Sequence, residues 1–470
     1  MPASQARFAV IGFLRASFAS LPSNLHWIFL LFASLLIIFL AVWTPPFQSA
    51  DETAHFYRAY QVAQGEFLRG GGGGYADSAI EQLYACVAAL PFKNKARFTA
   101  ADRAKAEEVQ WTGHLIDYQF PNTTVYAPTG YLPQALGVAF GKVTGMGVMR
   151  TLELARLLNG TFAILVCALA LCWCRRGKVV MFVVLLMPMT LSLFASCNQD
   201  TTLIALTCLA FAIVSRQIAA GAPLSLTQAT VLALSLLIVC LGRPPYVPLL
   251  LVLLIPHLLP PWRSKPSWLP GPFLAASLVA ATVVWWRVAS ASTRGLVPPS
   301  AAYGAVDAKL QLLNLFHHPG TVAVLAGYVF RHAAVYFAGM VGVMGWLDTP
   351  MPPSYYLAMV LVLLTACLAE LALGGKVKRS ATALLLVSPL AALAAVFLIE
   401  YLTWTWVGAP AIYGVQGRYG IPLAIAAGVG LPPLAGSAKI RERATAIVVL
   451  SQILTLVCLP RVIMARYYLP

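Results

Sequence analysis

The residues of this 470-residue chain that could do chemistry gather in five short groups, each next to an apolar run. The first group lies in PPFQSADETAHFYRAYQVAQGEF, which begins at Pro45 directly after LHWIFLLFASLLIIFLAVWT. It places Asp51, Glu52, His55 and Arg58 within two helical turns. The spacing predicts that Asp51, His55 and Arg58 share one face of a helix. An acid, an imidazole and a guanidinium beside a membrane would suit chemistry on a lipid headgroup.

The first group also has a purely structural interpretation. Ser49 is a good N-cap, and Glu52 follows it by three residues, which is the capping-box pattern. Asp51 would then favour the positive end of the helix. Helix capping and chemistry at Asp51 therefore both remain open from the sequence.

Four later groups repeat the combination of charged and aromatic residues. They are SCNQDTTL with Asp200, GRPPY with Arg243, GWLDTPMPPSYY with Asp348, and YLTWTWVGAPAIYGVQGRYGIP with Trp404, Trp406, Tyr413, Gln416, Arg418 and Tyr419. Structural alternatives exist here too. Asp200 could simply begin a helix, the aromatic residues could form an interfacial belt, and Arg418 could extend to the lipid headgroups.

The elements that must position these groups are membrane helices. The chain is 60% hydrophobic and only 10% charged, with a mean hydropathy of +0.78. Apolar runs long enough to cross a hydrocarbon core of about 30 Å recur along it, which predicts an all-α polytopic membrane protein. About eleven spans are expected, within a range of 10 to 13: residues 25–44, 155–173, 179–196, 201–214, 224–241, 247–259, 272–288, 355–373, 381–399, 420–434 and 444–459.

The net charge of +16 does not indicate nucleic-acid binding, because the basic residues fall in every other short loop between spans. These are Arg7, Arg15, Arg175, Arg176, Lys178, Arg216, Arg263, Lys265, Lys376, Lys378, Arg379, Lys439, Arg441 and Arg443. The positive-inside rule then makes residues 1–24 a cytoplasmic N-terminus and residues 25–470 a single membrane domain. Two long outer loops, 45–150 and 289–354, would carry interfacial helices.

Three segments do not follow the regular alternation of spans and short loops. Residues 131–149 are half apolar, but a crossing would invert all later basic loops, so we expect an interfacial helix. Residues 321–345 hold Arg331 and His332 at their centre, so we expect them to be outside or re-entrant. RGGGGGYAD, from Arg69, is predicted to be flexible and lacks the Lys-Ser/Thr of a phosphate loop.

All five groups fall on the outer side in this topology, whereas the spans are nearly free of ionisable residues away from their ends. Coupled transporters usually need such residues near the membrane midplane. The distribution therefore favours an enzyme acting on a lipid headgroup, or a surface receptor, over a pump.

The motifs resemble an uncharacterised bacterial family of predicted membrane proteins, domain-of-unknown-function family 2142. The similar stretches, in order, are PPFQSADETAHFYRAYQVAQGEF, SCNQDTTLIALTCLAFAI, GRPPYVPLLLVLLIP, GVMGWLDTPMPP and GVQGRYGIPL. That family is grouped with the GT-C glycosyltransferases, multi-span enzymes that take sugars from polyprenyl-phosphate donors. The resemblance implies a GT-C-like bundle in the bacterial cytoplasmic membrane, with its active site on the periplasmic face.

The resemblance also implies roles for individual residues. An early acid of the first outer loop acts as catalytic base or metal ligand in GT-C enzymes, which matches Asp51, with Glu52 beside it. Arg418 would stabilise the leaving phosphate, with Arg243 and Arg58 as second choices. The remaining substrate-binding candidates are His55, Asp200, Asp348, Trp404, Gln416 and Tyr419. Any metal would be Mg²⁺ or Mn²⁺ held by Asp51, Glu52 and Asp200.

The expected partners are the lipid-linked sugar donor, a glycan, lipid or protein acceptor of the cell envelope, and membrane lipids, with no nucleic acid. Two other functions stay open at this point. The chain could be a transporter or flippase of polyprenyl-linked glycans, or a non-catalytic subunit of a polysaccharide assembly complex.

Overall fold

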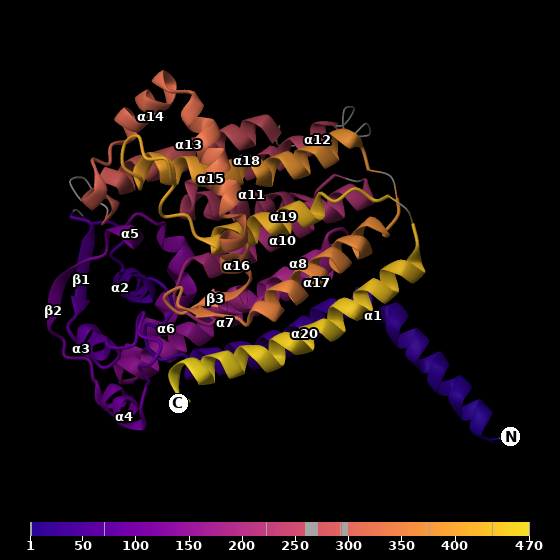
Figure 1. The fold of residues 1–470 in the computed structure, drawn as a ribbon, viewed down its shortest axis with the longest axis horizontal. Helices are drawn as coiled ribbons and strands as arrows, with labels where there is room; N and C mark the ends of the chain where they lie inside the picture. The colour runs from indigo at the N-terminus through magenta and orange to yellow at the C-terminus, as the bar shows by residue number, and fades with distance from the viewer. Residues whose placement is uncertain are drawn as a thin grey trace.

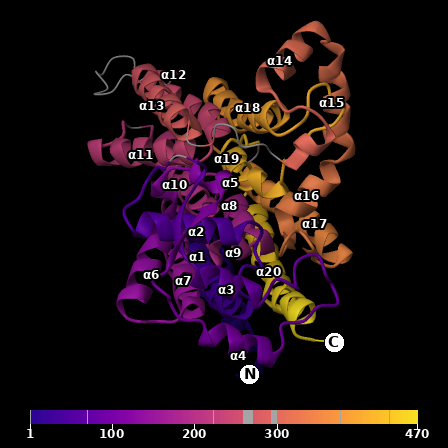
Figure 2. The same cartoon turned by 90° about the vertical axis from the view of Figure 1, so that its left-hand side faces the viewer.

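The computed structural model describes residues 2–69, 71–221, 223–258, 271–291, 293, 299–375, 377–434 and 436–469. Within these ranges it describes the side chains from residue 21 onward, except those of 257–258 and 299–300. Long helices run side by side as a bundle, and a compact lobe covers one end of it (Figure 1). A view turned by 90° shows helices α14 and α15 standing apart from this lobe on the other flank (Figure 2). Of the basic loop residues, Arg263, Lys265 and Lys376 lie outside the described part of the chain.

Seven described helices are long and apolar enough to cross a membrane. They are α1 (Pro2–Trp43, apolar from Leu21), α7 (Val148–Trp173), α10 (Asp200–Ala220), α13 (Gly271–Ala291), α17 (Pro353–Leu371), α18 (Arg379–Thr403) and α20 (Ala438–Tyr467). Helices α15 (Gly320–Arg331) and α16 (Ala333–Gly342) meet at a bend of 50° and make an eighth candidate if they form one span. The prediction of a multi-pass helical membrane protein is confirmed at this level.

The count of eleven spans is not confirmed, because proline shortens or divides the other four segments. Residues 179–196 form two short helices, α8 (Lys178–Leu185) and α9 (Pro188–Phe194). Residues 224–241 form α11 (Leu226–Gly242), whose 17 residues are about 26 Å long, shorter than a hydrocarbon core of about 30 Å. Residues 247–259 fall in η2 (Pro244–Leu254) and α12 (Ile255–Leu258), and residues 420–434 contain α19 (Ile421–Val429). A proline lacks the backbone N–H that a continuous helix needs, as at Pro188 and Pro248.

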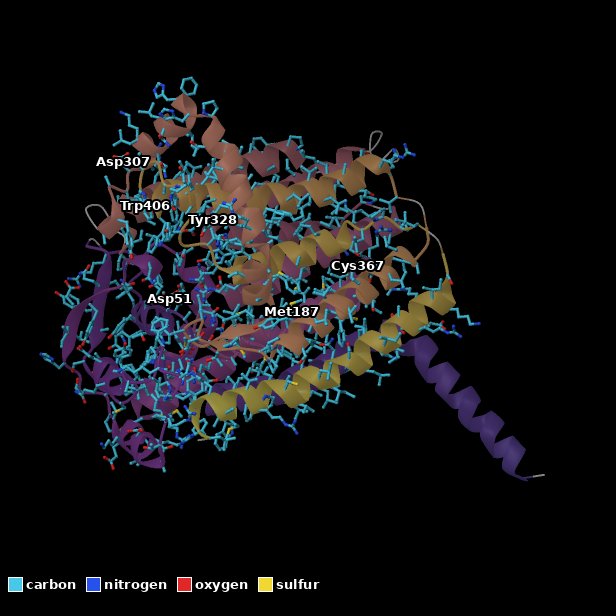
Figure 3. All side chains as sticks on the ribbon, in the orientation of Figure 1. Asp51, Met187, Asp307, Tyr328, Cys367 and Trp406 are labelled. Carbon is cyan, nitrogen blue, oxygen red and sulfur yellow. The ribbon has the colours of Figure 1, made fainter. Side chains whose placement is uncertain are left out.

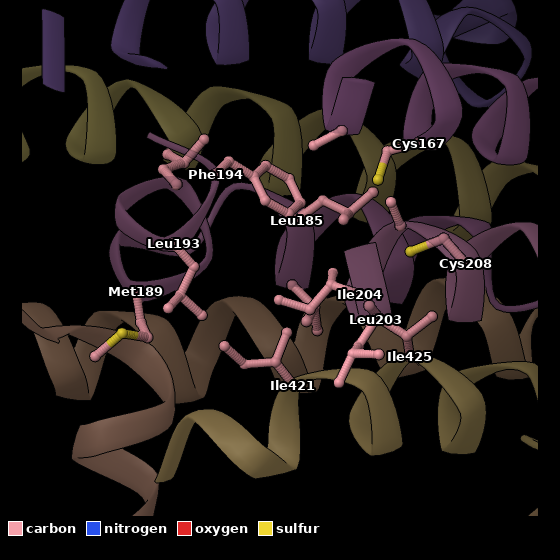
Figure 4. Close-up of a cluster of buried hydrophobic side chains, with 14 of the residues drawn as sticks. Cys167, Leu185, Met189, Leu193, Phe194, Leu203, Ile204, Cys208, Ile421 and Ile425 are labelled. Carbon is pink, nitrogen blue, oxygen red and sulfur yellow. The ribbon is translucent and has the colours of Figure 1, made fainter. Parts of the chain in front are cut away.

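Helices α8, α9 and α19 are buried at the centre of the bundle. Every residue of α8 is buried, as expected for a helix that is apolar on all sides after Lys178. Leu185 and Phe194 meet Leu203 and Ile204 of α10, with Ile421 and Ile425 of α19 opposite (Figure 4). These three short helices therefore form part of the core around which the long helices pack.

The lobe is built from the first predicted outer loop. It contains α2 (Glu52–Ala63), β1 (Gly73–Asp77), α3 (Ala79–Ala85), α4 (Ala100–Glu108), β2 (Leu115–Gln119), α5 (Pro121–Thr124), η1 (Pro128–Tyr131) and α6 (Leu132–Val143). Strands β1 and β2 pair antiparallel from Gly73↔Gln119 to Asp77↔Leu115. The prediction that RGGGGGYAD is flexible is therefore wrong for its second half. A Cβ at Gly73 would collide with the carbonyl oxygen of Tyr118, so glycine is what permits this pairing.

Helix α6 supports the interfacial prediction for residues 131–149. Its 12 residues are about 18 Å long, which is too short to span a bilayer. Leu132, Leu136, Phe140 and Val143 are exposed along one side, whereas Ala135, Val138 and neighbouring residues on the other side are buried.

The second predicted outer loop contains η4 (Pro299–Tyr303), α14 (Ala308–His317), the bent α15–α16 pair, and a hairpin of β3 (Val343–Met344) and β4 (Thr349–Pro350).

The far end of α20 fastens the lobe to the bundle. The backbone N–H of Phe98 donates to the carbonyl of Tyr467 over 2.8 Å. Arg466 donates to the carbonyl of Leu90 over 2.7 Å, and the Tyr468 hydroxyl donates to the carbonyl of Trp43 over 2.9 Å. Two parts of the chain that are distant in sequence are thereby held together beside the end of α1.

Candidate functional site

A chain of four charged side chains lies at the lobe end of the bundle, and we call it the outer network: Asp51, Arg418, Asp200 and Arg243. Arg243 Nη2 lies 2.8 Å from Asp200 Oδ1, and Arg418 Nε lies 3.4 Å from Asp200 Oδ2. Arg418 Nη2 then reaches Asp51 Oδ2 at 3.1 Å. Asp51 lies at the lobe end of the molecule, whereas Cys367 of α17 lies toward the opposite end (Figure 3). Four of the five sequence groups therefore contribute a side chain to one site.

Breaks between helices place these four side chains. Asp200 is the first residue of α10, and Arg243 follows α11, where Pro244 and Pro245 end the helix. Arg418 lies in the short turn η5 (Gly417–Gly420), which packs against α16. Asp51 precedes α2 and has a left-handed backbone with φ of +63°. This conformation is uncommon for a residue other than glycine, although aspartate tolerates it better than most.

The outer network is nearly closed off from solvent except at Asp51. The side chains of Asp200 and Arg418 are 8% and 5% exposed, whereas that of Asp51 is 34% exposed. Burial disfavours the charge on Arg418, but Asp200, Tyr419 and Asp51 outweigh this and raise its pKa above the ordinary value. The guanidinium of Arg243 lies 3.8 Å from the centre of the Tyr419 ring. Two acids and two arginines compensate each other, and only one of the acids faces outward.

Asp51 borders an open pocket of about 290 Å³ in the lobe. Tyr57, Tyr84, Phe120 and Trp346 supply aromatic surface to it. The side chain of Asn122 at its edge donates to Asp51 Oδ1 over 3.5 Å. The outward carboxylate is therefore accessible from a partly aromatic hollow.

His55 and Arg58 make their hydrogen bonds inside the lobe, and among the described residues neither bonds to Asp51. His55 Nδ1 lies 2.7 Å from the hydroxyl of Tyr131, and burial lowers the pKa of His55 to about 4. Arg58 donates to the carbonyls of Phe67 and Tyr126 over 2.8 and 2.9 Å. His55 still lies within electrostatic reach of all four residues of the outer network, whereas Arg58 serves the interior of the lobe.

Glu52 occupies a buried ion pair rather than the pocket. Its Oε2 lies 2.6 Å from Arg156 Nη2, and both side chains are at most 1% exposed. Arg156 also donates to the carbonyls of Ala41, Thr44 and Pro45, which close the end of α1. No side-chain cap forms at the start of α2, where Asp51 and not Ser49 is the N-cap, so the predicted capping box is wrong. Glu52 is paired with Arg156 and therefore has a structural role.

Asp348 supports the pocket wall without reaching the pocket. It accepts from Arg466 over 2.9 Å, from the backbone N–H of Phe92 over 3.0 Å and from that of Trp346 over 3.2 Å. Trp346 is further fixed because its Nε1 donates to the carbonyl of Phe47 over 3.0 Å. Asp348 therefore positions an aromatic ring that lines the pocket.

The other residues of the last sequence group lie between the end of α18 and the start of η5. The Oε1 atom of Gln416 is buried and has no hydrogen-bond partner in the described part of the chain. Trp404 lies beside Gly414 at the end of α18, and Trp406 packs against Tyr413 with ring centres 4.8 Å apart. The described residues that line the pocket at Asp51 do not include Trp404, Trp406, Tyr413 or Gln416.

Sequence reasoning missed several residues of the site. Tyr57, Tyr84, Phe120 and Asn122 lie in the lobe, and their meeting depends on how the lobe folds. Glu400, near the end of α18, lies within electrostatic reach of Arg243 and was not singled out. As a lone carboxylate at the end of an apolar run, in FLIEYL, it was the one member with a visible signal.

The acids do not fit the suggested metal site. No group of three or more His, Cys, Asp or Glu side chains is arranged to hold a metal ion among the described residues. The guanidinium of Arg418 lies between Asp51 and Asp200, and Arg156 occupies Glu52. A cation would have to displace two arginines, so no Mg²⁺ or Mn²⁺ enters the mechanism below.

Comparison with known proteins agrees with the resemblance seen in the motifs. A family model described as a predicted membrane protein, DUF2142, matches residues 32–427, which is more than four fifths of the chain. The chain belongs to the DUF2142 family. No curated protein and no solved structure matches it. In this DUF2142 protein the matched range includes all four residues of the outer network and ends before α20.

Proposed function

We propose that this DUF2142 protein is a membrane glycosyltransferase. It would transfer a sugar from a polyprenyl-phosphate donor to a cell-envelope acceptor, with inversion at the anomeric carbon, on the outer face of the bacterial cytoplasmic membrane. One observation carries the proposal: Asp51, the only outward acid of the outer network, joins an open pocket to a pair of buried arginines. A base beside cations is what transfer from a phosphate leaving group requires.

The reaction follows from these positions. Asp51 accepts the proton of an acceptor hydroxyl, and the resulting oxygen attacks the anomeric carbon of the donor. The bond between that carbon and the phosphate oxygen breaks, and its electrons leave with the polyprenyl phosphate. Arg418 stabilises the phosphate, because a guanidinium matches phosphate oxygens. Its Nε lies 3.4 Å from Asp200 Oδ2 but makes no hydrogen bond among the described residues. Arg243 adds a second positive charge behind Asp200.

The placement on the outer face is supported by the loops at the opposite end of the bundle. Arg176 donates to the carbonyl of Leu431 over 2.7 Å, and Gly177 donates to Glu370 over 2.8 Å. These contacts join the basic turn after α7 to the end of α17 and to the segment before α20, at the end of the bundle that is opposite the lobe. The positive-inside rule then assigns that end to the cytoplasm.

Cells that lack this protein provide the test. They would be complemented with the wild type, with Asp51→Asn or with Asp117→Asn, at matched membrane levels. Asp117 is a suitable control because it is an exposed acid of the same lobe. Mass spectrometry of surface glycans and polyprenyl-linked sugars should show that only Asp51→Asn fails to restore a missing sugar and accumulates one lipid-linked donor. Full restoration by Asp51→Asn would instead favour a scaffold subunit or a flippase.

A further inference from the structure

The pocket beside Asp51 differs in character from the outer network behind it. Its surface is made of aromatic rings and side-chain amides: Tyr57, Tyr84, Phe120, Trp346, Gln119 and Asn122. Among the described residues that line it, Asp51 carries the only formal charge. A pocket of this kind has no cation to hold a phosphate, so the donor phosphate belongs on the arginine side.

The two oxygens of Asp51 face these two environments separately. Oδ1 accepts from Asn122 at the pocket edge, over 3.5 Å, whereas Oδ2 accepts from Arg418 over 3.1 Å. The carboxylate therefore marks the boundary between an uncharged compartment and a cationic one. Two substrates that react at Asp51 would approach it from these two sides.

We propose that the pocket beside Asp51 binds an uncharged sugar ring of a glycan acceptor and presents one of its hydroxyl groups to Asp51. This inference rests on the proposed glycosyltransferase function and adds the chemical class of the acceptor. The pocket volume of about 290 Å³ is close to the lower limit of small-molecule sites, which suits one or two sugar rings.

The aromatic wall suits the apolar face of a sugar. Trp346 is held from two directions, by Phe47 at its indole nitrogen and by Asp348 at its backbone N–H. A ring that is fixed before binding loses little conformational entropy when a ligand stacks on it. The amides of Asn122 and Gln119 are exposed and can exchange hydrogen bonds with sugar hydroxyls.

Other acceptors suit the pocket less well. An acidic sugar would place its carboxylate near Asp51, and like charges repel at this distance. An acyl chain would displace water from the exposed amides of Asn122 and Gln119 without replacing the hydrogen bonds of that water, which costs free energy. A neutral glycan satisfies both the polar groups and the aromatic surface.

Ligand binding by the purified full chain in detergent tests the assignment without requiring turnover. Saturation-transfer NMR would use neutral trisaccharides of hexoses and of N-acetylhexosamines, with a uronic-acid trisaccharide of equal length as the charged probe. The proteins would be the wild type, Asp51→Asn, Trp346→Phe and Trp346→Ala. Phe316→Ala is the matched control, because Phe316 is an 82% exposed aromatic residue on α14, outside the pocket.

We expect at least one neutral trisaccharide to bind the wild type, Phe316→Ala and Asp51→Asn. Trp346→Ala should weaken that binding by about tenfold or more, and Trp346→Phe, which keeps a ring face, by less. Equal binding by Trp346→Ala, preference for the uronic acid, or no binding of any neutral sugar would overturn the assignment. Sugar binding through Trp346 without transfer in the cell assay would refute the transferase function instead, so the two failures are distinguishable.

Discussion

Asp51 and Glu52 are adjacent acids with opposite surroundings. The Asp51 side chain is one third exposed, borders a pocket and touches the edge of a network of charges. The Glu52 side chain is fully buried and accepts from Arg156 and from the backbone N–H of Cys197. The left-handed backbone at Asp51 separates them, because it turns one carboxylate toward the pocket just before α2 begins with the other.

The comparison teaches that proximity in sequence does not make a catalytic pair. A buried ion pair that also bonds several backbone groups fixes where chain segments meet, here the end of α1, the start of α2 and helix α7. An acid that keeps some exposure beside buried arginines retains access to a substrate. Position 52 should therefore control folding, and position 51 should control activity.

Replacement of the outward acid should have the largest effect, and it should fall on the reaction. Asp51→Asn is expected to lower the transfer rate by about 10²- to 10⁴-fold, the usual contribution of a general base. The thermal unfolding temperature in detergent should stay close to that of the wild type. The rate would be measured by mass spectrometry of product formed in isolated membranes, with Asp117→Asn as the control. A rate within a factor of two of the wild type would remove Asp51 from the mechanism.

Replacement of the inward pair should act on stability. Arg156→Met leaves Glu52 buried without its partner and is expected to cost about 3–5 kcal/mol of unfolding free energy. The double variant Glu52→Gln/Arg156→Met should recover a large part of that loss, because no uncompensated charge remains. Denaturant unfolding of the detergent-solubilised protein measures both changes. Additive losses in the double variant would show that the two side chains do not act as a pair.

The pH dependence of stability extends the comparison to His55, which lies one turn further along α2. Burial lowers the pKa of His55 to about 4, below the usual 6.5, so the folded protein binds its proton later than the unfolded chain does. The stabilisation is complete above pH 6.5 and is lost as the pH falls from 6.5 to 4, by about 3 kcal/mol in total. Between pH 4 and 6.5, the unfolding free energy of His55→Gln should therefore depend less on pH than that of the wild type. Identical pH dependence of the two proteins would show that other groups dominate acid unfolding.

The smallest expected effect concerns the arginine that touches Asp51. Arg418→Lys keeps a positive charge but loses the planar donor array, and we expect about a tenfold loss of kcat/KM for the donor. Arg58→Lys, in the lobe interior, is the matched control and should leave the donor kinetics unchanged. Kinetic assays at varied donor concentration separate the two. An Arg418→Lys enzyme with wild-type donor kinetics would place the phosphate elsewhere.

Much of this arrangement could be predicted from the sequence, because apolar run length and basic loops depend on local composition. That pattern predicted the seven long helices and the non-spanning helix near residue 131. It also predicted that Asp51, Asp200, Arg243 and Arg418 lie at one end of the molecule. The division of the central segments by proline was not predicted. Residues 179–196 are mostly apolar, and yet one helix ends at Leu185 and the next begins at Pro188.

The pocket could not be predicted, because its walls come from separate parts of the lobe and from Trp346 in the β3–β4 hairpin. Helical periodicity also did not predict that His55 and Arg58 would make their hydrogen bonds inside the lobe and not with Asp51. It assumes a regular backbone, and the positive φ of Asp51 breaks that assumption. Which acid faces a pocket is decided by such a turn, and the residue type alone does not reveal it.

The contacts between the end of α20 and the lobe have a consequence for biogenesis. The ribosome makes the lobe segment long before Tyr467 and Tyr468, yet those residues bond Phe98 and Trp43. The lobe therefore lacks these contacts until the last helix of the chain has been made and has packed against α1. Packing of α20 thus completes the attachment of the lobe that carries Asp51.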